Sequence, residues 1–388
     1  MKLTAKIKLQ PTPDQYDLLL NTLEAANEAC NYTSQQAWDS ETFEQYPLHH
    51  QVYRAIREQF GLAAQMAVRA IGKVADAYKL DRKTRRTFAP HGAFPYDGRI
   101  LSFRTDGQTV SIWTLKGRLR IGYLCGQHQH ELLEGNRGEA DLCFINGAFY
   151  LFVACEVETP EPPNVEAFLG VDLGIVNLAT DSDGEVFSGE AVEHSRRQYE
   201  HRRRNLQRKG TRAARRKLKQ LSGKQVNFQT NTNHCISKRI VQKAQGTGRG
   251  IALENLKGIR DRVTVGRKQR ARHANWAFHQ LRKFVEYKAE LAGVRVVTVD
   301  PRNTSRICPV CGCIDKANRP SQSRFSCVSC GFSASADHIA ARNIRARAAV
   351  NQPNEHLAQG SAAPLQAASA CPASPGPPRA AAATSHLL

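Results

Sequence analysis

The sequence predicts two architectures in series: a small β-barrel that carries a helical insert, then an α/β core that carries a cysteine-rich insertion. Three observations predict this fold class. Short alternating strands separated by turn residues fill the first part of the chain, which ends in a proline-rich stretch at residues 159–164. Farther on, short apolar strands each carry one carboxylate. Two Cys-x-x-Cys pairs then precede a last helical segment.

The first strand and the first helix are clear local predictions. Residues 2–10 alternate between apolar and polar side chains, which is the pattern of a half-exposed strand. Thr12 can cap a helix, Pro13 suits the first helical position, and Gln15 stands where a capping box requires it. Apolar residues then recur at helical spacing, and a second helical region is predicted from about residue 49 to residue 80.

From about residue 82 the pattern changes to short strands. Asp106-Gly107 and Asn146-Gly147 are hairpin turn signals. The strands are expected at residues 100–103, 109–114, 119–123, 140–145 and 149–157. We therefore expect a β-barrel formed by residues 1–10 and 82–160, with a helical insert at residues 11–81.

The chain is strongly basic. Its 55 lysines and arginines outnumber its 35 acidic residues, and the formal net charge is +20. Charge on this scale favours a polyanionic partner, most commonly nucleic acid. A membrane surface is the competing polyanion, but no apolar run approaches the roughly 20 residues that a spanning helix needs. The first residues also lack the apolar segment of a signal peptide, so we expect a soluble intracellular protein.

The predicted core opens with an apolar strand at residues 168–175, which carries Asp172 between Gly170 and Gly174. Burying an unpaired charge costs several kcal/mol, so the strand itself gains nothing from this carboxylate. Asp172 is either a chance residue of an edge strand or a metal ligand. If it is a ligand, the glycines leave room for metal and phosphate, and tight packing of the strand is their alternative role. A hairpin, with strands at 178–181 and 185–188, is expected next.

Two more carboxylates lie on later elements. Glu254 comes near the end of an apolar strand at residues 250–256, before a predicted helix at 276–291 and a strand at 294–299. Asp337 falls in the first turn of another helix, where capping or a helix-dipole interaction is its simpler role. If these elements pack together, the three carboxylates suit Mg²⁺, which prefers oxygen ligands. Two such ions activate water and stabilise the leaving oxygen in phosphodiester hydrolysis, with Asp172 bridging both.

Residues 193–221 are predicted to form a very basic helix, and residues 260–272 a basic loop. Acidic partners four residues away are nearly absent in the helix, so its self-repulsion is not relieved internally. A solvated face is one role for such a charge run, and an external polyanion is the role we favour. The expected nucleic-acid contacts are Arg202, Arg203, Arg204, Arg215, Arg216 and Lys217.

Eleven cysteines divide into scattered single residues and one cluster. Cys308, Cys311, Cys327 and Cys330 form two Cys-x-x-Cys pairs, which fit a tetrahedral zinc site, whereas Cys313 lies outside this spacing. Four thiolates leave no open coordination position, so the zinc is expected to be structural. The expected boundaries are 308–332 for the zinc ribbon, 165–307 and 333–350 for the α/β core, and 351–388 for a disordered tail rich in alanine and proline.

Taken in order, these motifs resemble the TnpB (OrfB) proteins of insertion sequences, which are compact relatives of type V CRISPR effector nucleases. The resemblance covers about residues 1–350. The family usually has Asn near Ile339, where this chain departs from the pattern. The resemblance rests on PTPDQ at 11–15, GVDLG at 170–174, LENL at 253–256, TSRICPVCG at 304–312, FSCVSCG at 325–331, AD at 336–337 and AARNI at 340–344.

The resemblance implies a RuvC-type, RNase H-like nuclease core with the zinc ribbon inserted before the last catalytic helix. It implies a wedge-type N-terminal barrel that carries a helical recognition insert. Carried over by motif, Asp172, Glu254 and Asp337 are the catalytic triad and the Mg²⁺ ligands.

The resemblance also implies partners and a place in the cell. A guide RNA transcribed from the element end selects target DNA by base pairing, while the protein reads a short motif beside the target. The implied compartment is the cytoplasm of a bacterium or archaeon, with the protein on the nucleoid when it is bound to DNA.

Three other functions compete with this one. A catalytically inactive, RNA-guided DNA-binding repressor would lack one or more core carboxylates, and all three are present. A single-strand transposase would need a His-hydrophobic-His metal pair, which neither HQH at 128–130 nor HH at 49–50 provides. A zinc-ribbon DNA-binding module without activity explains the cysteines and the charge but leaves Asp172 unexplained.

Overall fold

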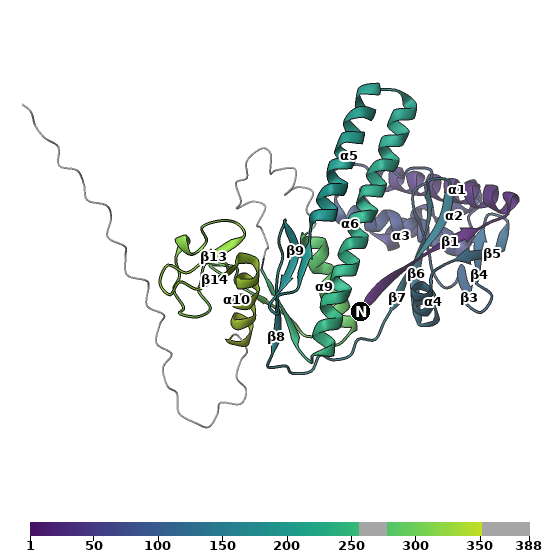
Figure 1. Cartoon of the computed structure of the whole chain (residues 1–388). Coiled ribbons are helices and arrows are strands. Elements are labelled where there is room, and N and C mark those ends of the chain that lie inside the picture. The colour runs from purple at the N-terminus through teal and green to yellow at the C-terminus, as the bar shows by residue number, and fades with distance from the viewer. Residues whose placement is uncertain (256–277, 351–388) are drawn as a thin grey trace, which may run out of the picture. The chain divides into compact units, whose positions relative to one another are not determined.

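The computed structural model of the chain describes residues 1–255 and 278–350. They fall into two compact units, which divide between Glu158 and Thr159, at the predicted proline-rich stretch (Figure 1). Three predictions lie outside the described residues: the basic loop at 260–272, the first residues of the helix expected from 276, and the tail at 351–388.

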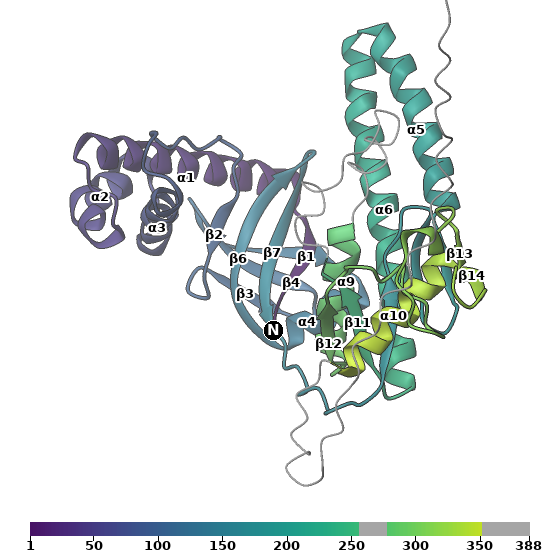
Figure 2. The same ribbon diagram turned by 90° about the vertical axis from the view of Figure 1, so that its left-hand side faces the viewer.

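The N-terminal unit is built on one antiparallel sheet of seven strands, in the order β2-β6-β7-β1-β5-β4-β3 (Figure 2). Asn146 and Gly147 both have positive φ, as the predicted hairpin turn requires. The sequence patterns did not predict β2 or the short helix α4 (Gln127–Glu134). The strands are β1 (Lys2–Gln10), β2 (Phe94–Tyr96), β3 (Leu101–Arg104), β4 (Thr109–Thr114), β5 (Gly117–Leu124), β6 (Asn136–Ile145) and β7 (Ala148–Glu156).

Three helices are inserted between β1 and β2. The predicted capping box is present: the Thr12 hydroxyl accepts from the Gln15 amide, and the Gln15 side chain accepts from the Thr12 amide. The single helical region predicted from residue 49 to residue 80 is in fact two helices. Gly61 adopts a left-handed conformation (φ 64°) that ends the first of them. The helices are α1 (Pro13–Asp39), α2 (Gln45–Phe60) and α3 (Ala64–Leu80).

One hydrophobic core joins these helices to one face of the sheet. Ala5, Ile7 and Leu9 of β1 are buried, whereas the polar residues between them are exposed. Ala26 of α1 and Ile71 of α3 belong to the same buried cluster. The period-two pattern of the first strand therefore decides which face of the sheet the helices cover.

The C-terminal unit contains a mixed sheet of five strands in the order β10-β9-β8-β11-β12. The first three strands along the chain form an antiparallel succession, and β11 and β12 then continue the sheet in parallel from the other edge of β8. The strands are β8 (Phe168–Asp172), β9 (Asn177–Asp181), β10 (Val186–Ser188), β11 (Gly250–Glu254) and β12 (Val296–Val299).

Helices cover both faces of this sheet. On one face, Val171 and Leu253 share a buried cluster with residues of α6 (Arg212–Gly246) and α9 (Phe278–Leu291). On the other face, Phe168 and Ala252 pack with Ile344 of α10 (Ala336–Val350). Both strands are thus buried on both sides, which explains why each reads as a continuous apolar run.

The basic segment predicted as one helix from 193 to 221 forms parts of two. α5 (Glu190–Lys209) ends at Gly210, which adopts a left-handed conformation (φ 62°). Thr211 then caps α6 by accepting a hydrogen bond from the Ala214 amide. The two helices run side by side as a hairpin, and α6 continues past the hairpin to cover the sheet (Figures 1 and 2).

Candidate metal centre and nucleic-acid surface

Two neighbouring parallel strands each end in a carboxylate. β8 ends at Asp172 and β11 ends at Glu254. The register pairs Val171 with Leu253, so the two carboxylates stand level at the same end of the sheet. Side chains alternate between the faces of a strand, and the paired Val171 and Leu253 face α6 and α9. Asp172 and Glu254 therefore belong to the face that α10 covers.

Helix α10 packs closely on β8 and brings the third carboxylate to this end of the sheet. Gly170 permits the close approach, because a Cβ atom there would lie 2.1 Å from the backbone oxygen of Ala341 in α10. Asp337 is in the first turn of that helix. At Gly174 a Cβ atom would lie 2.5 Å from the backbone oxygen of Asn177. The glycines thus serve close backbone packing, and the interpretation that they leave room for metal and phosphate is wrong.

The three carboxylates interact electrostatically. Burial raises the pKa of Asp172 well above its ordinary value, and the negative charges of Glu254 and Asp337 raise it further. Burial also raises the pKa of Glu254. Like charges collected in a buried place are unfavourable unless a cation joins them. The donor set, three hard oxygen ligands with a raised pKa at its centre, therefore fits a divalent cation such as Mg²⁺.

Three residues that act on the carboxylates, two by hydrogen bonds and one by its charge, were not predicted as site residues. The Asn177 amide nitrogen donates to Asp337 Oδ2 at 2.8 Å, and the Thr304 hydroxyl donates to Glu254 Oε1. Against the effect of burial, the Thr304 hydrogen bond and the charges of Arg347 and Arg319 lower the pKa of Glu254, and the charge of Arg319 lowers that of Asp172. Thr304 opens the TSRICPVCG motif, which was a usable signal. Asn177 and Arg319 belong to none of the sequence motifs that indicated the site.

The four predicted cysteines come together. Their Sγ atoms all lie within 4.8 Å of one another, with 3.6 Å between Cys308 and Cys330 and 3.5 Å between Cys311 and Cys327. Tetrahedral zinc with Zn–S bonds of about 2.3 Å separates its sulfur ligands by about 3.8 Å. The cluster can therefore hold a metal such as zinc.

The backbone around these cysteines is held by hydrogen bonds within the ribbon, which includes β13 (Arg324–Ser326) and β14 (Ser333–Ser335). The Cys308 amide donates to the Cys313 carbonyl at 2.9 Å. The side chain of Asn318, which is fully buried, donates to the Arg306 and Cys313 carbonyls. The thiols of the cluster shift one another's pKa: that of Cys311 is lowered, most strongly by a backbone hydrogen bond with Cys313, whereas that of Cys330 is raised by burial and by the other three thiols.

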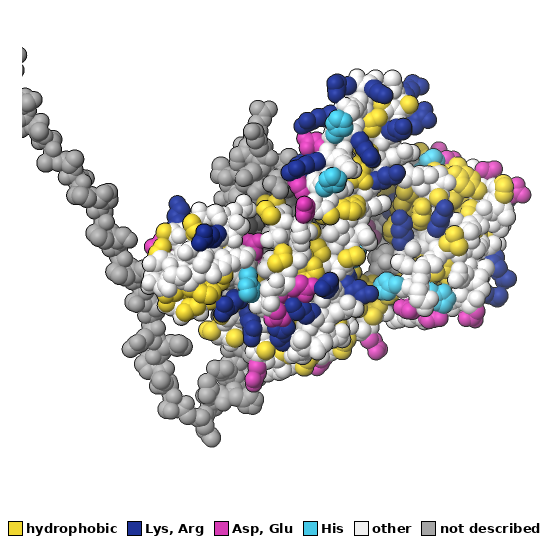
Figure 3. Space-filling view, in the orientation of Figure 1, with side chains coloured by type: hydrophobic (Ala, Val, Ile, Leu, Met, Phe, Trp, Pro, Cys, Tyr) yellow, Lys and Arg dark blue, Asp and Glu magenta, His cyan; other side chains and the backbone are white. Residues whose placement is uncertain are grey.

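The basic residues predicted to contact nucleic acid lie on the α5–α6 hairpin, and all are exposed. Figure 3 shows lysine and arginine side chains gathered over the end of the hairpin. Between Glu200 and Glu254 the sequence contains no acidic residue. The predicted contact residues are Arg202, Arg203 and Arg204 on α5, and Arg215, Arg216 and Lys217 on α6.

The prediction that acidic partners are nearly absent from this helix is wrong for much of α5. Glu193 pairs with Arg196 at 2.8 Å and with Arg197 at 3.0 Å. Glu200 pairs with Arg204 at 2.6 Å. Glutamates thus relieve repulsion where the hairpin leaves the sheet, and the unrelieved positive charge is concentrated towards the hairpin end.

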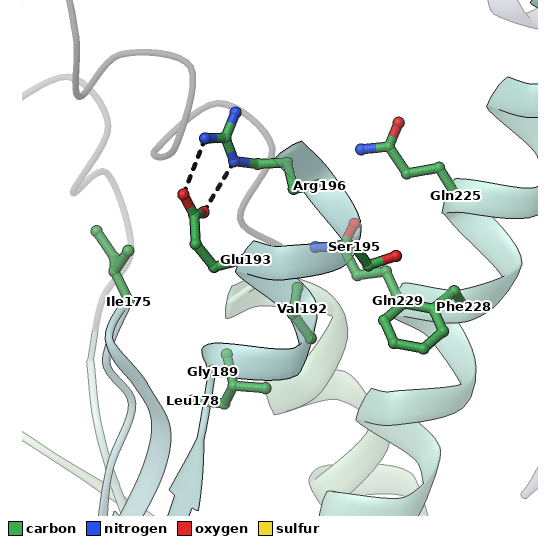
Figure 4. Close-up of a pocket in the computed structure, with 10 residues that line it drawn as sticks. All are labelled: Ile175, Leu178, Gly189, Val192, Glu193, Ser195, Arg196, Gln225, Phe228 and Gln229. Atoms are coloured by element: carbon green, nitrogen blue, oxygen red, sulfur yellow. Dashed lines mark hydrogen bonds and ion pairs between the residues drawn. The ribbon is translucent and has the colours of Figure 1, made fainter. Parts of the chain in front are cut away.

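A pocket lies where the hairpin leaves the sheet (Figure 4). The ion pair of Glu193 and Arg196 stands at one side of it. Of the described residues that line the pocket, none is one of the three carboxylates. The pocket is therefore a feature separate from the metal centre. Its apolar lining comes from Ile175, Leu178, Val192 and Phe228.

Two family descriptions match the chain. The family described as "Probable transposase" (OrfB_IS605) matches residues 152–259, and "Cas12f1-like, TNB domain" matches residues 278–344. The TnpB-like protein of Methanocaldococcus jannaschii is 30% identical over 196 residues, which cover 69% of that protein and 47% of this chain. The chain belongs to the TnpB (OrfB) family.

The TnpB-family chain also resembles larger proteins. The CRISPR-associated endodeoxyribonuclease Cas12f1 of Sulfoacidibacillus thermotolerans is 37% identical over 199 residues, covering 47% of this chain and 46% of that protein. A Cas12f1 of Syntrophomonas palmitatica is 33% identical over 218 residues, which are 51% of this chain and 43% of that protein. The chain thus spans about half the length of these curated relatives.

Solved structures share the fold of this TnpB-family chain. A Cas12f1 chain in a complex with sgRNA and target DNA superimposes with a TM-score of 0.61, over 86% of this chain and 83% of that chain, at 15% identity. The mini-RNA-guided endonuclease CRISPR-Cas_phi3 gives a TM-score of 0.53 over 91% and 93%, at 10% identity. The fold is therefore that of a compact type V effector nuclease. Within the described ranges, no helix combines the length and apolar character needed to cross a membrane.

Proposed function

We propose that this chain is an RNA-guided DNA endonuclease of a transposable element. It cleaves target DNA by Mg²⁺-dependent phosphodiester hydrolysis in a RuvC-type site, next to a short motif that the protein reads. One observation carries the proposal: Asp172 and Glu254 end neighbouring parallel strands, and the negative charges of Glu254 and Asp337 both act on Asp172. The relatives named as a CRISPR-associated endodeoxyribonuclease and a TnpB-like protein agree with it.

Asp172 is the central ligand in this proposal. It stands level with Glu254 on the neighbouring strand, and its pKa responds to both other carboxylates. Asp172 therefore suits a ligand shared by two ions, with Glu254 and Asp337 each holding one. When bound, the Mg²⁺ ions lower the pKa of a water molecule and stabilise the leaving oxygen. The protein holds the ligand oxygens in fixed positions: Asn177 donates to Asp337, and Thr304 donates to Glu254.

Arg319 supplies positive charge from the protein itself. Its charge acts on Asp172 and Glu254, so it lies near the place where a scissile phosphate would meet the ions. A guanidinium binds phosphate oxygens through directed hydrogen bonds. We propose that Arg319 orients the scissile phosphate and stabilises the charge that builds up on it during hydrolysis.

The nucleic-acid partners are a guide RNA and the target DNA. The exposed arginines and lysine at 202–204 and 215–217 bind the sugar-phosphate backbone, because phosphate contacts dominate affinity for nucleic acid. In this proposal the seven-stranded sheet is the wedge-type domain, formed by residues 1–10 and 82–160, and α1 to α3 are the recognition insert at 11–81.

The proposal also assigns the nuclease core and the zinc ribbon. Residues 165–307 and 333–350 form the RuvC-like, RNase H-like core, which the order of three antiparallel and two parallel strands supports. The ribbon at 308–332 holds one structural Zn²⁺ through Cys308, Cys311, Cys327 and Cys330.

The test is cleavage of a plasmid by the full chain, purified from a host that carries the native locus, together with the RNA that co-purifies. We expect Mg²⁺-dependent cutting that Asp172→Asn abolishes while DNA binding persists. Asn177→Ser provides a milder comparison, because it changes a hydrogen bond and keeps all three carboxylates. Cutting by Asp172→Asn would refute the assigned site. Tight binding without cutting by the wild-type chain would favour the catalytically inactive repressor.

A further inference from the structure

The Glu254 carboxylate accepts a hydrogen bond from an uncharged side chain. The Thr304 hydroxyl, on the segment that follows β12, donates a hydrogen bond to Glu254 Oε1. Thr304 is only 4% exposed, so water competes little for this bond. A lysine or arginine in the same place would neutralise the carboxylate and compete with a bound cation. A hydroxyl instead fixes the orientation of the carboxylate and leaves its negative charge available to a metal ion.

Thr304 is itself fixed from α10. The Asn343 side-chain nitrogen donates to the Thr304 carbonyl at 2.7 Å and to the Ile307 carbonyl at 2.9 Å. An amide nitrogen has two hydrogens, so this pair of acceptors uses its full donor capacity. Asn343 is 6% exposed and lies on the helix that carries Asp337. One buried amide therefore ties two carbonyls of the segment after β12 to the helix of the third carboxylate.

The same segment leads into the cysteine cluster. Ile307 immediately precedes Cys308, whose amide donates to the Cys313 carbonyl within the ribbon. A continuous set of contacts thus runs from the first ribbon cysteine, through Asn343 and Thr304, to Glu254. Thr304 belongs to the TSRICPVCG motif and Asn343 to the AARNI motif. Asn343 has no role in the chemistry described so far.

We propose that Thr304 and Asn343 are positioning residues for the metal centre. They hold Glu254 in the orientation that binds a divalent cation, and they couple that orientation to the ribbon and to α10. The inference rests on the proposed function of the three carboxylates as a metal site. It goes further by assigning a positioning role to Asn343 and by linking that role to Thr304. Loss of a residue that hydrogen-bonds to a metal ligand typically weakens metal affinity by about 10–100-fold.

The test measures Mn²⁺ binding to the full chain without nucleic acid, from the loss of the electron paramagnetic resonance signal of free Mn²⁺. Thr304→Val keeps the side-chain shape and removes the hydroxyl, and Thr304→Ser keeps the hydroxyl. We expect Thr304→Val to weaken Mn²⁺ binding about tenfold and Thr304→Ser to bind like the wild type. Asn343→Leu, which loses both donors at similar size, is expected to weaken binding in the same way.

Thr304→Ala provides the same comparison if the valine variant does not fold, because it removes the hydroxyl without adding a methyl group against Glu254. Thermal unfolding and circular dichroism identify variants that are folded. A hydroxyl-free variant that binds Mn²⁺ like the wild type would overturn the inference. So would a Thr304→Ser variant as weak as Thr304→Ala, since the effect would then not depend on the hydroxyl. Unchanged binding by folded Asn343→Leu would remove Asn343 from the proposal.

Two outcomes separate this inference from the proposed function. If Mn²⁺ binds in a manner that Asp172→Asn abolishes and Thr304→Val weakens, but the wild-type chain never cuts DNA, the nuclease function fails and the positioning role stands. If the wild-type chain cuts DNA and all folded Thr304 variants bind Mn²⁺ alike, the positioning role fails and the function stands. Wild-type protein without any Asp172-dependent Mn²⁺ binding would overturn the inference outright.

Discussion

Asp172 lies where the ionised form of its side chain destabilises the folded chain. It ends a strand that is buried on both faces, and two further carboxylates raise its pKa beyond the effect of burial. The unfolded chain ionises an ordinary aspartate near pH 3.9, whereas the folded chain without metal retains the proton to higher pH. The folded state therefore loses stability as pH rises from about 4 through the raised pKa, and a bound cation removes this loss.

We predict that Asp172→Asn stabilises the chain in Mg²⁺-free buffer more at pH 7 than at pH 4.5, because only the wild type must bury a carboxylate that prefers to ionise. The measurement is the difference in thermal unfolding midpoint between variant and wild type across this pH range. Saturating Mg²⁺ is expected to raise the midpoint of the wild type more than that of the variant. A difference that stays constant with pH would contradict the prediction.

Arg319 is expected to act on the reaction more than on binding. Its charge reaches Asp172 and Glu254, so Arg319→Ala removes a cation close to the metal centre. We predict that the single-turnover rate of DNA cleavage falls by about tenfold or more, while affinity for guide and target changes little. Arg324→Ala, at an exposed arginine of the same ribbon, is the matched control and should cut at the wild-type rate. Equal rates for both variants would rule out this role.

At the scale of elements, the contact between α10 and β8 decides whether the third carboxylate reaches the others. Gly170 faces the backbone of α10, and a Cβ atom there would meet backbone rather than a movable side chain. We predict that Gly170→Ala lowers the free energy of unfolding by about 1–3 kcal/mol. Chemical denaturation measures this change.

Gly223 provides the comparison for that substitution. It lies inside α6, and beyond the backbone of its own helix a Cβ atom there would meet no heavy atom within 4 Å. Gly223→Ala is therefore expected to stabilise the chain by about 0.5–1 kcal/mol, because alanine favours a helix more than glycine does. If both substitutions shifted stability in the same direction, the close approach of α10 would not be the cause of the change at Gly170.

Some arginines of the α5–α6 hairpin form ion pairs with glutamates, whereas those near its end have no glutamate nearby in the sequence. We predict that the double change Arg215→Gln with Arg216→Gln reduces the slope of log affinity against log salt by roughly 2 for duplex DNA, because two phosphate contacts are lost. Arg196→Gln with Arg197→Gln removes the same charge from arginines that already pair with Glu193 and should reduce the slope less. Fluorescence anisotropy at several salt concentrations measures both. Equal slopes would contradict phosphate binding at the hairpin end.

At the scale of the whole molecule, the chain divides at an exposed stretch that contains several glutamates and prolines. We predict that limited digestion with a glutamate-specific protease cuts first at Glu158, Glu161 or Glu166. It should yield two fragments that stay folded, because each unit has its own buried core. Mass spectrometry identifies the cuts and circular dichroism checks the fragments. First cuts at Glu139 in β6 or at Glu254 in β11 would contradict the division.

The sequence predicted features that depend on local pattern. Alternation located β1, the Cys-x-x-Cys pairs located the ribbon cluster, and the Thr12 capping box located the start of α1. It did not predict the breaks at Gly61 and Gly210, because a lone glycine inside a helical pattern is usually tolerated.

Features that depend on distant contacts were also missed. Asn177 meets Asp337 across 160 positions, and the charge of Arg319 acts on Asp172 from a distant part of the chain. The role of Gly170 was misinterpreted for the same reason, since the helix that touches it lies at the other end of the domain sequence.

The place of α10 in the chain has a consequence for the timing of synthesis. Asp172 and Glu254 leave the ribosome well before Asp337, which follows the whole ribbon. A nascent chain that has been translated only as far as β12 has two of the three carboxylates and no α10 to cover their side of the sheet. In the proposed function, such a chain cannot cut DNA. Under the proposed function, the order of residues along the chain thus delays nuclease activity until nearly all of the described fold has been made.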